Sequence, residues 1–243
     1  MIRAQGHGLV YYQFPALSAE RNLRHGFFTR LGGVSHPPYA SLNVGASVGD
    51  DPEAVRLNRE RCFAALGFAE GQVVTPNQVH GTTVVRVGAA DGGRTLEATD
   101  GLVTDEWGVA LFLRFADCVP IVLWDRERPA VGLVHAGWRG TLAGIAREAV
   151  SAMQAHFGSA PSRLWAGIGP AIGPCCYEVG PELADTFEGH FGARVVSRPH
   201  TGNPRVDLAE ANAQTLVIIQ IESRSGVEEA DAIAAVDGVD VLW

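Results

Sequence analysis

The chain has 243 residues and a formal net charge of −8, and 47% of its residues are hydrophobic and 19% charged, which excludes a disordered or collagen-like chain. All 19 basic residues are arginine, so lysine Schiff-base chemistry and a P-loop are also excluded. The acidic balance, without any basic block, argues against nucleic-acid and anionic-membrane partners.

Short apolar runs alternate with amphipathic segments along the chain. Expected strands cover residues 9–14, 25–29, 72–75, 83–87, 101–104, 109–115, 119–124, 130–135 and 164–168. Expected helices cover residues 52–66, 141–157, 181–191 and 208–220, and Asp51 is the expected N-cap of the first. Several strands follow one another directly, which favours an α+β layered sandwich with mixed β-sheets over a doubly wound fold. No linker or repeat divides the chain, so we expect residues 1–243 to form a single domain.

The sequence also predicts the compartment of the protein. The longest apolar run, residues 108–124, contains Arg114 and Asp117 and cannot form a membrane-spanning helix. The N-terminal residues show no apolar stretch of the signal-peptide kind. The four cysteines include no C-x-x-C pair and are too sparse for a disulfide-rich scaffold. We therefore expect a cytoplasmic protein without a membrane partner.

Three potential metal ligands lie at the ends of expected strands. His80 lies in the segment NQVHG, Cys118 in ADCVP and His135 in HAGWRG. Side chains at such positions can converge on a cleft while a sheet holds them in place. Two imidazoles and one thiolate suffice for a catalytic zinc site with a fourth position open to water. The long spacings leave two alternatives open, namely a hydrolase with Cys118 as nucleophile and His135 as base, and purely structural residues.

The residues after His135 form a candidate anion site. Glycines at the start of the following helix would leave N–H groups free to attract an anion. Arg139 could donate two hydrogen bonds to a phosphate, and a surface ion pair is the alternative for this side chain. The Gly/Pro-rich loop 167–174 would form either a pocket wall or an ordinary turn. We expect the neighbouring Cys175 and Cys176 to be core thiols.

Several segments together carry a family resemblance. They are HGFFTRLGGVS (25–35), YASLN (39–43), NRERC (58–62), PNQVHG (76–81), ATDGLVT (98–104), ADCVPIVL (116–123), VGLVHAGWRGTLAGI (131–145) and GIGPAIGPCCYEVG (167–180). In this order they resemble the family once labelled multicopper polyphenol oxidoreductase or laccase-like and now described as purine nucleoside phosphorylases, which includes the bacterial peptidoglycan-editing factor. The pair ADC-x-P and HAGWRG is highly specific.

The resemblance implies a zinc site formed by His80, Cys118 and His135, and an α/β/β/α sandwich fold. It also implies phosphorolysis of adenosine, inosine, guanosine and methylthioadenosine, with phosphate as the second substrate, together with adenosine deamination. We expect Arg139 to bind the phosphate, and Arg30 and Asn43, in the matching N-terminal segments, to contact substrate. Copper, which the older label implies, is less favoured because the eight histidines include no H-x-H pair.

The end of the chain departs from the family pattern. Chains of this family usually close with C-T, F-F-S-x-R-R and G-R segments, and residues 216–243 contain none of them. Two alternatives to a zinc-dependent phosphorylase with deaminase activity therefore stay open. One is a metal-free Cys/His hydrolase acting in peptidoglycan editing, and the other is a catalytically dead nucleoside-binding module.

Overall fold

The computed structural model describes residues 1–216, 218–219 and 241–242. The predicted divergence of residues 216–243 therefore lies almost wholly outside the described residues. The chain divides into two compact units. The first comprises Met1–Val74, Asp91–Arg94 and Gly108–Ala110, and the second comprises Thr75–Ala90, Thr95–Trp107 and Leu111–Trp243. The expectation of a single domain stays a prediction.

The first unit contains a three-stranded antiparallel sheet and one long helix. The sheet has the order β1 (Ile2–Gly6), β2 (Leu9–Gln13) and β3 (Phe27–Phe28), and β1 was not predicted because its side chains are mostly exposed and show no apolar alternation. The helices are α1 (Pro15–Ser18) and α2 (Pro52–Ala65), followed by a 3-10 turn at Glu70–Gln72. The predicted start of α2 is confirmed, since the Asp51 side chain accepts a hydrogen bond from the Glu53 N–H.

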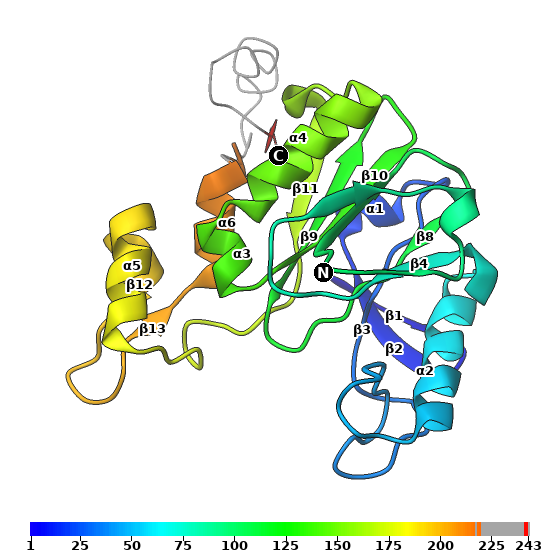
Figure 1. The fold of residues 1–243 in the computed structure, drawn as a ribbon, viewed down its shortest axis with the longest axis horizontal. Helices are drawn as coiled ribbons and strands as arrows, with labels where there is room; N and C mark the ends of the chain where they lie inside the picture. The colour runs from blue at the N-terminus through cyan, green and yellow to red at the C-terminus, as the bar shows by residue number, and fades with distance from the viewer. Residues whose placement is uncertain (217, 220–240, 243) are drawn as a thin grey trace. The chain divides into compact units, whose positions relative to one another are not determined.

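The second unit is organised around a five-stranded sheet (Figure 1). Its order is β11 (Leu164–Ile168), β9 (Val119–Asp125), β10 (Ala130–Ala136), β7 (Gly101–Thr104) and β5 (Val84–Arg86). All neighbours are antiparallel except β5 and β7, which run parallel. The predicted fold class, α+β with mixed sheets, is thereby confirmed.

The smaller elements complete the described chain. The short strands are β4 (Val73–Pro76), β6 (Thr95–Leu96), β8 (Ala110–Leu111), β12 (Val196–Ser197), β13 (Arg205–Val206), β14 (Ile218–Ile219) and β15 (Val241–Leu242). The helices of the second unit are α3 (Trp138–Leu142), α4 (Ile145–Phe157), α5 (Pro181–Phe191) and α6 (Leu208–Leu216), with 3-10 turns at Ala89–Asp91, Pro161–Arg163 and Ala193–Val195. None of the helices in the described residues is long and apolar enough to cross a membrane.

Three predicted elements are corrected by the structure. The helix expected over residues 208–220 ends at Leu216, and Ile218–Ile219 form the strand β14 instead. The helix expected over residues 141–157 is two helices, α3 and α4, because Gly144 between them has a φ of +82°, which a continuous right-handed helix cannot accommodate. The strand expected over residues 109–115 is reduced to β8 at Ala110–Leu111. In contrast, β7, β11 and α5 have the predicted bounds.

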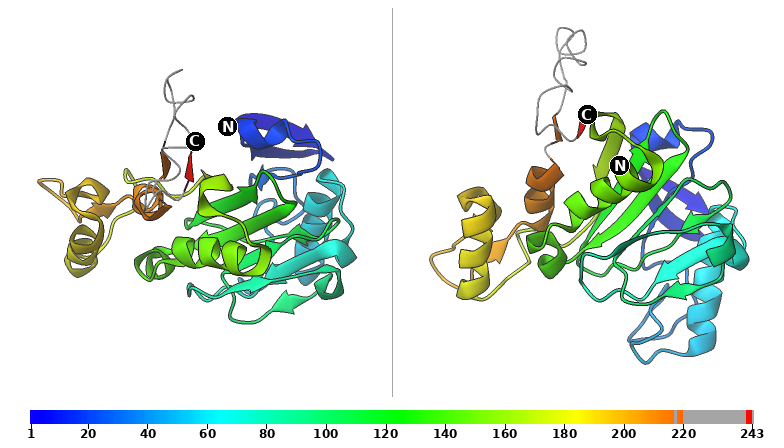
Figure 2. Two further views of the ribbon diagram at one scale, coloured as in Figure 1. Left: turned by 90° about the horizontal axis from the view of Figure 1, so that it is seen from above. Right: turned by 45° about the horizontal axis from the view of Figure 1, so that its top comes forward.

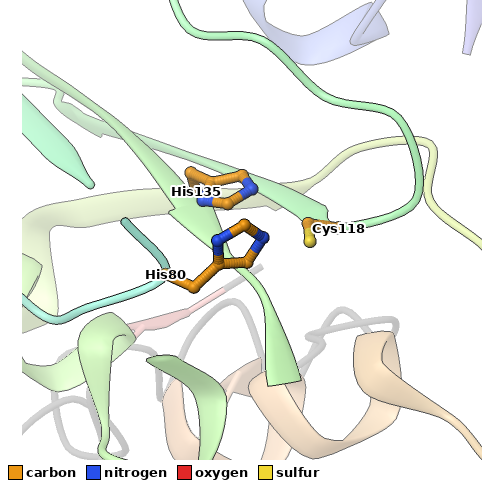
Figure 3. Close-up of side chains that lie close together, drawn as sticks. All are labelled: His80, Cys118 and His135. Carbon is orange, nitrogen blue, oxygen red and sulfur yellow. The ribbon is translucent and has the colours of Figure 1, made fainter. Parts of the chain in front are cut away.

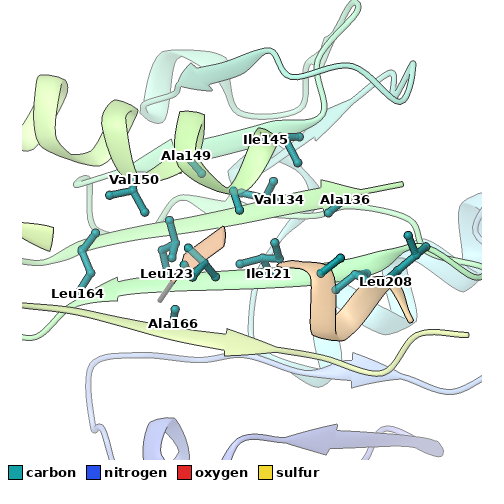
Figure 4. Packing of buried hydrophobic residues seen from close by; sticks show 14 of the residues in the cluster. Ile121, Leu123, Val134, Ala136, Ile145, Ala149, Val150, Leu164, Ala166 and Leu208 are labelled. Atoms are coloured by element: carbon teal, nitrogen blue, oxygen red, sulfur yellow. The ribbon is translucent and has the colours of Figure 1, made fainter. Parts of the chain in front are cut away.

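The core of the second unit lies between the five-stranded sheet and α4, which crosses one face of the sheet (Figure 2). Ile121, Leu123 and Val134 of the two central strands are fully buried. They pack with Ile145 and Ala149, which lie one helical turn apart on α4 (Figure 4). All residues of β9 except Trp124 are buried, which explains why this strand is almost continuously apolar in sequence.

Candidate metal centre

Four chain segments meet at one end of the strands of the five-stranded sheet. Cys118 directly precedes β9. His135 is the second-last residue of β10, where it pairs with Pro120 of the antiparallel β9. Asp100 directly precedes β7, whose first residue Gly101 pairs with Val134 of β10. The loop with His80 precedes β5, whose first residue pairs with Gly101 as well. Strand register therefore places the predicted ligands together although they are far apart in sequence.

The three predicted ligands point toward one another (Figure 3). One ligand atom from each of His80, Cys118 and His135 can be chosen so that all lie within 4.8 Å of one another. The imidazole rings of His80 and His135 meet edge to face, with 4.8 Å between their centroids. His135 is buried, with 4% of its surface exposed, whereas Cys118 is half-buried. Solvent can therefore reach the centre from one side.

Asp100 is a fully buried carboxylate that contacts both histidine segments. Its Oδ1 accepts hydrogen bonds from the His80 N–H at 2.9 Å and from His135 Nδ1 at 2.9 Å. Its Oδ2 accepts from the N–H groups of Gly81 at 2.7 Å and Val79 at 3.2 Å. Because an ionised carboxylate can only accept, His135 carries its proton on Nδ1 and presents the Nε2 lone pair to the centre. This aspartate belongs to the ATDGLVT segment, and no role was predicted for it from the sequence.

A second connection fixes the His80 loop. The side chain of Gln78 donates from Nε2 to the Arg114 carbonyl at 2.8 Å, and its Oε1 accepts from the Arg114 N–H at 3.0 Å. The Arg114 guanidinium donates in turn to the Pro76 carbonyl at 3.3 Å. Gln78 thus ties the loop with His80 to the backbone of Arg114, beyond the end of β8. Phe115, next in sequence, covers His135 with 5.6 Å between ring centroids.

Gly137 leaves space that the two ligands occupy. A Cβ atom at this position would lie 2.6 Å from Cδ2 of His80 and 3.1 Å from Sγ of Cys118. A Cβ at Gly140 would lie 2.9 Å from the carbonyl oxygen of Gly81. These distances are shorter than van der Waals contact, so the glycines of HAGWRG are required for the close approach of the His80 loop rather than for helix geometry.

Electrostatics at the centre favours the neutral forms of His135 and Cys118 in the metal-free protein. Burial lowers the pKa of His135, opposed by its hydrogen bond and charge interaction with Asp100. Burial and then the charges of Asp117 and Asp100 raise the pKa of the Cys118 thiol. A reactive nucleophilic cysteine needs the opposite shift, so the metal-free site disfavours the Cys118–His135 hydrolase that the sequence left open. A bound metal ion would itself deprotonate the thiol.

The donor set fits a metal ion. With metal–ligand distances of about 2.0–2.3 Å, donors on tetrahedral zinc lie roughly 3.5 Å apart, a small adjustment from the observed arrangement. Within the described part of the chain, this is the one group of three His, Cys, Asp or Glu side chains placed to share an ion. A laccase needs further histidine-rich copper sites. One Cys and two His with an open position are the chemistry of catalytic zinc.

The predicted phosphate residue lies on α3, directly after the His135 strand. The Arg139 guanidinium stacks over the Trp138 ring, 4.4 Å from its centroid. Across residues 1–216 the structure records no carboxylate paired with Arg139, so the surface ion pair considered as an alternative is not seen. Its positive charge is therefore available to an anion.

The Gly/Pro-rich loop lies against the segment that carries Cys118. The Ile172 N–H donates to the Asp117 carbonyl at 2.9 Å, and the Gly169 N–H donates to the Pro120 carbonyl at 2.8 Å. The loop is therefore held against the Cys118 segment, and its role as a pocket wall stays a prediction. The expectation that Cys175 and Cys176 are core thiols was wrong, since both are exposed. The turn at residues 174–176 faces solvent, and only the loop residues before it are held against the sheet.

Arg30 and Asn43 belong to the first unit. Asn43 Nδ2 donates to Asp50 Oδ2 at 2.9 Å, and its Oδ1 accepts from the Gly45 N–H at 3.0 Å. The guanidinium of Arg30 lies 3.5 Å from the Ala40 carbonyl oxygen. These bonds shape the loop between β3 and α2. Contact of either residue with substrate stays a prediction.

Comparison with known proteins gives the family. A family model described as multi-copper polyphenol oxidoreductase laccase matches residues 24–235. YlmD of Geobacillus stearothermophilus, named a purine nucleoside phosphorylase, is 42% identical over 205 residues, which are 79% of this chain and 74% of the relative. A purine nucleoside phosphorylase of Corynebacterium glutamicum is 36% identical over 217 residues, 87% of each chain.

A solved structure agrees with this relationship. The crystal structure of YlmD from Geobacillus stearothermophilus superposes with a TM-score of 0.79 at 34% sequence identity, covering 100% of this chain and 86% of that chain. The family match spans the strands and loops that carry His80, Cys118 and His135. The chain therefore belongs to the family described as multi-copper polyphenol oxidoreductase laccase, relatives of which carry the name purine nucleoside phosphorylase.

Proposed function

We propose that the protein is a zinc-dependent purine nucleoside phosphorylase with an additional adenosine deaminase activity. The observation that supports this most is the convergence of His80, Cys118 and His135. Their ligand atoms lie within 4.8 Å of one another at one end of the strands of the sheet. The names of the relatives favour phosphorolysis of purine nucleosides over oxidation of phenols. Adenosine, inosine, guanosine and methylthioadenosine are the proposed substrates.

The three ligands and Asp100 would hold the metal ion. His80, Cys118 and His135 supply the donor atoms, and Asp100 keeps the Nδ1 proton of His135 away from the ion. Bound zinc would supply a Lewis acid that lowers the pKa of a water molecule, the chemistry that replacement of the adenosine amino group needs. The remaining open side of the centre is where the nucleoside would bind.

Arg139 would bind the phosphate. It is exposed, its positive charge has no carboxylate partner among the described residues, and Trp138 holds it by stacking. In phosphorolysis a phosphate oxygen attacks C1′ of the ribose while the bond from C1′ to the purine breaks. A guanidinium donates two hydrogen bonds to such an anion and orients it for attack. Arg30 and Asn43 are the proposed further contacts to substrate.

A product assay tests the proposal. The zinc-loaded protein is incubated with inosine and phosphate, and ribose 1-phosphate and hypoxanthine are measured by chromatography. We expect both products only when phosphate is present, and inosine from adenosine in its absence. A Cys118→Ala variant, which loses one ligand, should lose zinc and both activities. Absence of ribose 1-phosphate with the zinc-replete protein would refute the phosphorylase.

The same samples distinguish the alternatives. A metal-free Cys/His hydrolase would keep its activity after zinc removal and lose it on alkylation of Cys118. A catalytically dead binding module would bind inosine without forming product. We expect instead that chelation abolishes turnover and that zinc restores it.

A further inference from the structure

The proposed function makes no use of the adjacent cysteines Cys175 and Cys176. Both are exposed, and their Sγ atoms lie 3.1 Å apart. The thiol groups of neighbouring residues usually diverge, but here the turn brings them together. The N–H groups of Cys176 and Tyr177 both donate to the Gly173 carbonyl, at 3.0 and 3.1 Å.

The turn is held on both sides. Before it, the Ile172 N–H donates to the Asp117 carbonyl at 2.9 Å. After it, the Tyr177 carbonyl accepts from the Val206 N–H at 3.2 Å, and the Val179 N–H donates to the Pro204 carbonyl at 2.9 Å. The backbone on either side of the two thiols is therefore fixed, and the sulfur atoms are close before any reaction takes place.

A disulfide bond formed between these two thiols would be easily reduced. A disulfide bond is about 2.0 Å long, so the sulfur atoms need to move roughly 1 Å closer. The Cα atoms of neighbouring residues are about 3.8 Å apart, below the usual range of about 4.4–6.8 Å for bridged cysteines. A strained, exposed disulfide is easily reduced, which is typical of regulatory and not of structural bridges.

We propose that Cys175 and Cys176 form a reversible oxidation site whose oxidant is a low-molecular-weight disulfide such as glutathione disulfide. One thiolate attacks a sulfur of glutathione disulfide, and a glutathione thiolate leaves. The neighbouring thiolate then attacks the protein sulfur of this mixed disulfide, and the second glutathione thiolate leaves. The protein loses two electrons and two protons, and one glutathione disulfide becomes two molecules of glutathione.

Trypsin makes the test direct, because every basic residue of the chain is arginine. The peptide Leu164–Arg194 contains Cys175 and Cys176 and no other cysteine, while Cys62 and Cys118 fall in two other peptides. The folded full-length protein is equilibrated with glutathione disulfide and glutathione at graded ratios. Free thiols are then blocked with iodoacetamide, and the peptides are measured by mass spectrometry.

We expect the peptide Leu164–Arg194 to lose two hydrogens and to escape alkylation at oxidising ratios, and to be doubly alkylated again after excess glutathione is added. In Cys175→Ser and Cys176→Ser variants the second step is impossible, so a glutathione adduct should persist on the remaining cysteine. A wild-type peptide that stays doubly alkylated at every ratio, or that accumulates only glutathione adducts, would overturn the proposal. This readout does not depend on zinc or on nucleoside turnover, so it is separate from the test of the proposed function.

Discussion

Replacement of Asp100 by asparagine should weaken zinc binding and also lower the stability of the fold. In the wild type each carboxylate oxygen accepts from two donors, Oδ1 from His80 and His135 and Oδ2 from Val79 and Gly81. An asparagine has one acceptor oxygen and one NH2 group. If its oxygen replaces Oδ1, the NH2 group faces the N–H groups of Val79 and Gly81. If its oxygen replaces Oδ2, His135 must accept at Nδ1 and carry its proton on Nε2, where it cannot bind a metal.

Either orientation leaves donors without an acceptor in a buried place. An unsatisfied buried donor costs about 1–3 kcal/mol. When the N–H groups of Val79 and Gly81 both lose their acceptor, the free energy of unfolding of the Asp100→Asn protein should fall by roughly 2–6 kcal/mol. Loss of a carboxylate that orients a metal ligand typically lowers metal affinity about 10–100-fold. We expect a decrease of this size for zinc.

Competition with a chelating dye measures the zinc affinity, and urea unfolding of the metal-free protein measures the stability. Asp125→Asn is the matched control, because Asp125 is also fully buried and its Oδ1 accepts from the Glu127 N–H at 3.0 Å. It lies at the other end of β9, about 20 Å from the centre. The control should keep the wild-type zinc affinity. Wild-type zinc affinity in Asp100→Asn would refute the role of Asp100 in orienting the ligands.

Three further predictions concern single positions. Gly137→Ala places a methyl group 2.6 Å from Cδ2 of His80 and should lower the zinc content of the purified protein at least ~10-fold, measured by elemental analysis. Gly189→Ala, where a Cβ meets no atom within 4 Å, is its control and should leave the zinc content unchanged. Arg139→Ala should raise the KM for phosphate about 10–100-fold, the loss of a charge-assisted hydrogen bond, at unchanged zinc content; a raised KM for inosine alone would contradict phosphate binding. Burial lowers the pKa of His25 to about 4, so this residue destabilises the fold progressively as pH falls from about 6.5 to about 4. Urea midpoints across this window should fall more in the wild type than in His25→Gln, and parallel curves would show that His25 is not responsible.

The positions of Cys118 and His135 at the ends of apolar runs made them candidate ligands, but their long spacing from His80 left the site open, and the shared metal site was implied only by the family resemblance. Cys118 and His135 flank the paired strands β9 and β10, whose antiparallel register follows from a short connection. Asp100 was not predicted, since one aspartate before a glycine is typical of a turn. Its role depends on hydrogen bonds to a loop 20 residues away. The sequence did indicate that Asp100 directly precedes a buried strand, which places it at the same end of the sheet as the ligands.

The fold was predicted best where burial dictates the sequence. The strands β7 and β11 are buried and apolar, and their bounds were found. The helix break at Gly144 was missed because the apolar periodicity continues across it, although a glycine within such a pattern indicates a possible end. The exposure of Cys175 and Cys176 was missed because cysteine is usually buried. Only the three-dimensional path of the turn decides this point.

The central claim is that one zinc ion binds between two imidazoles and one thiolate. Anomalous X-ray diffraction from crystals of the purified protein, recorded on both sides of the zinc absorption edge, tests it most directly. We predict a single strong peak in contact with His80, Cys118 and His135 that appears above the zinc edge. A peak that appears above the copper edge instead would contradict the account. So would crystals of the zinc-loaded protein that show no peak between these three side chains.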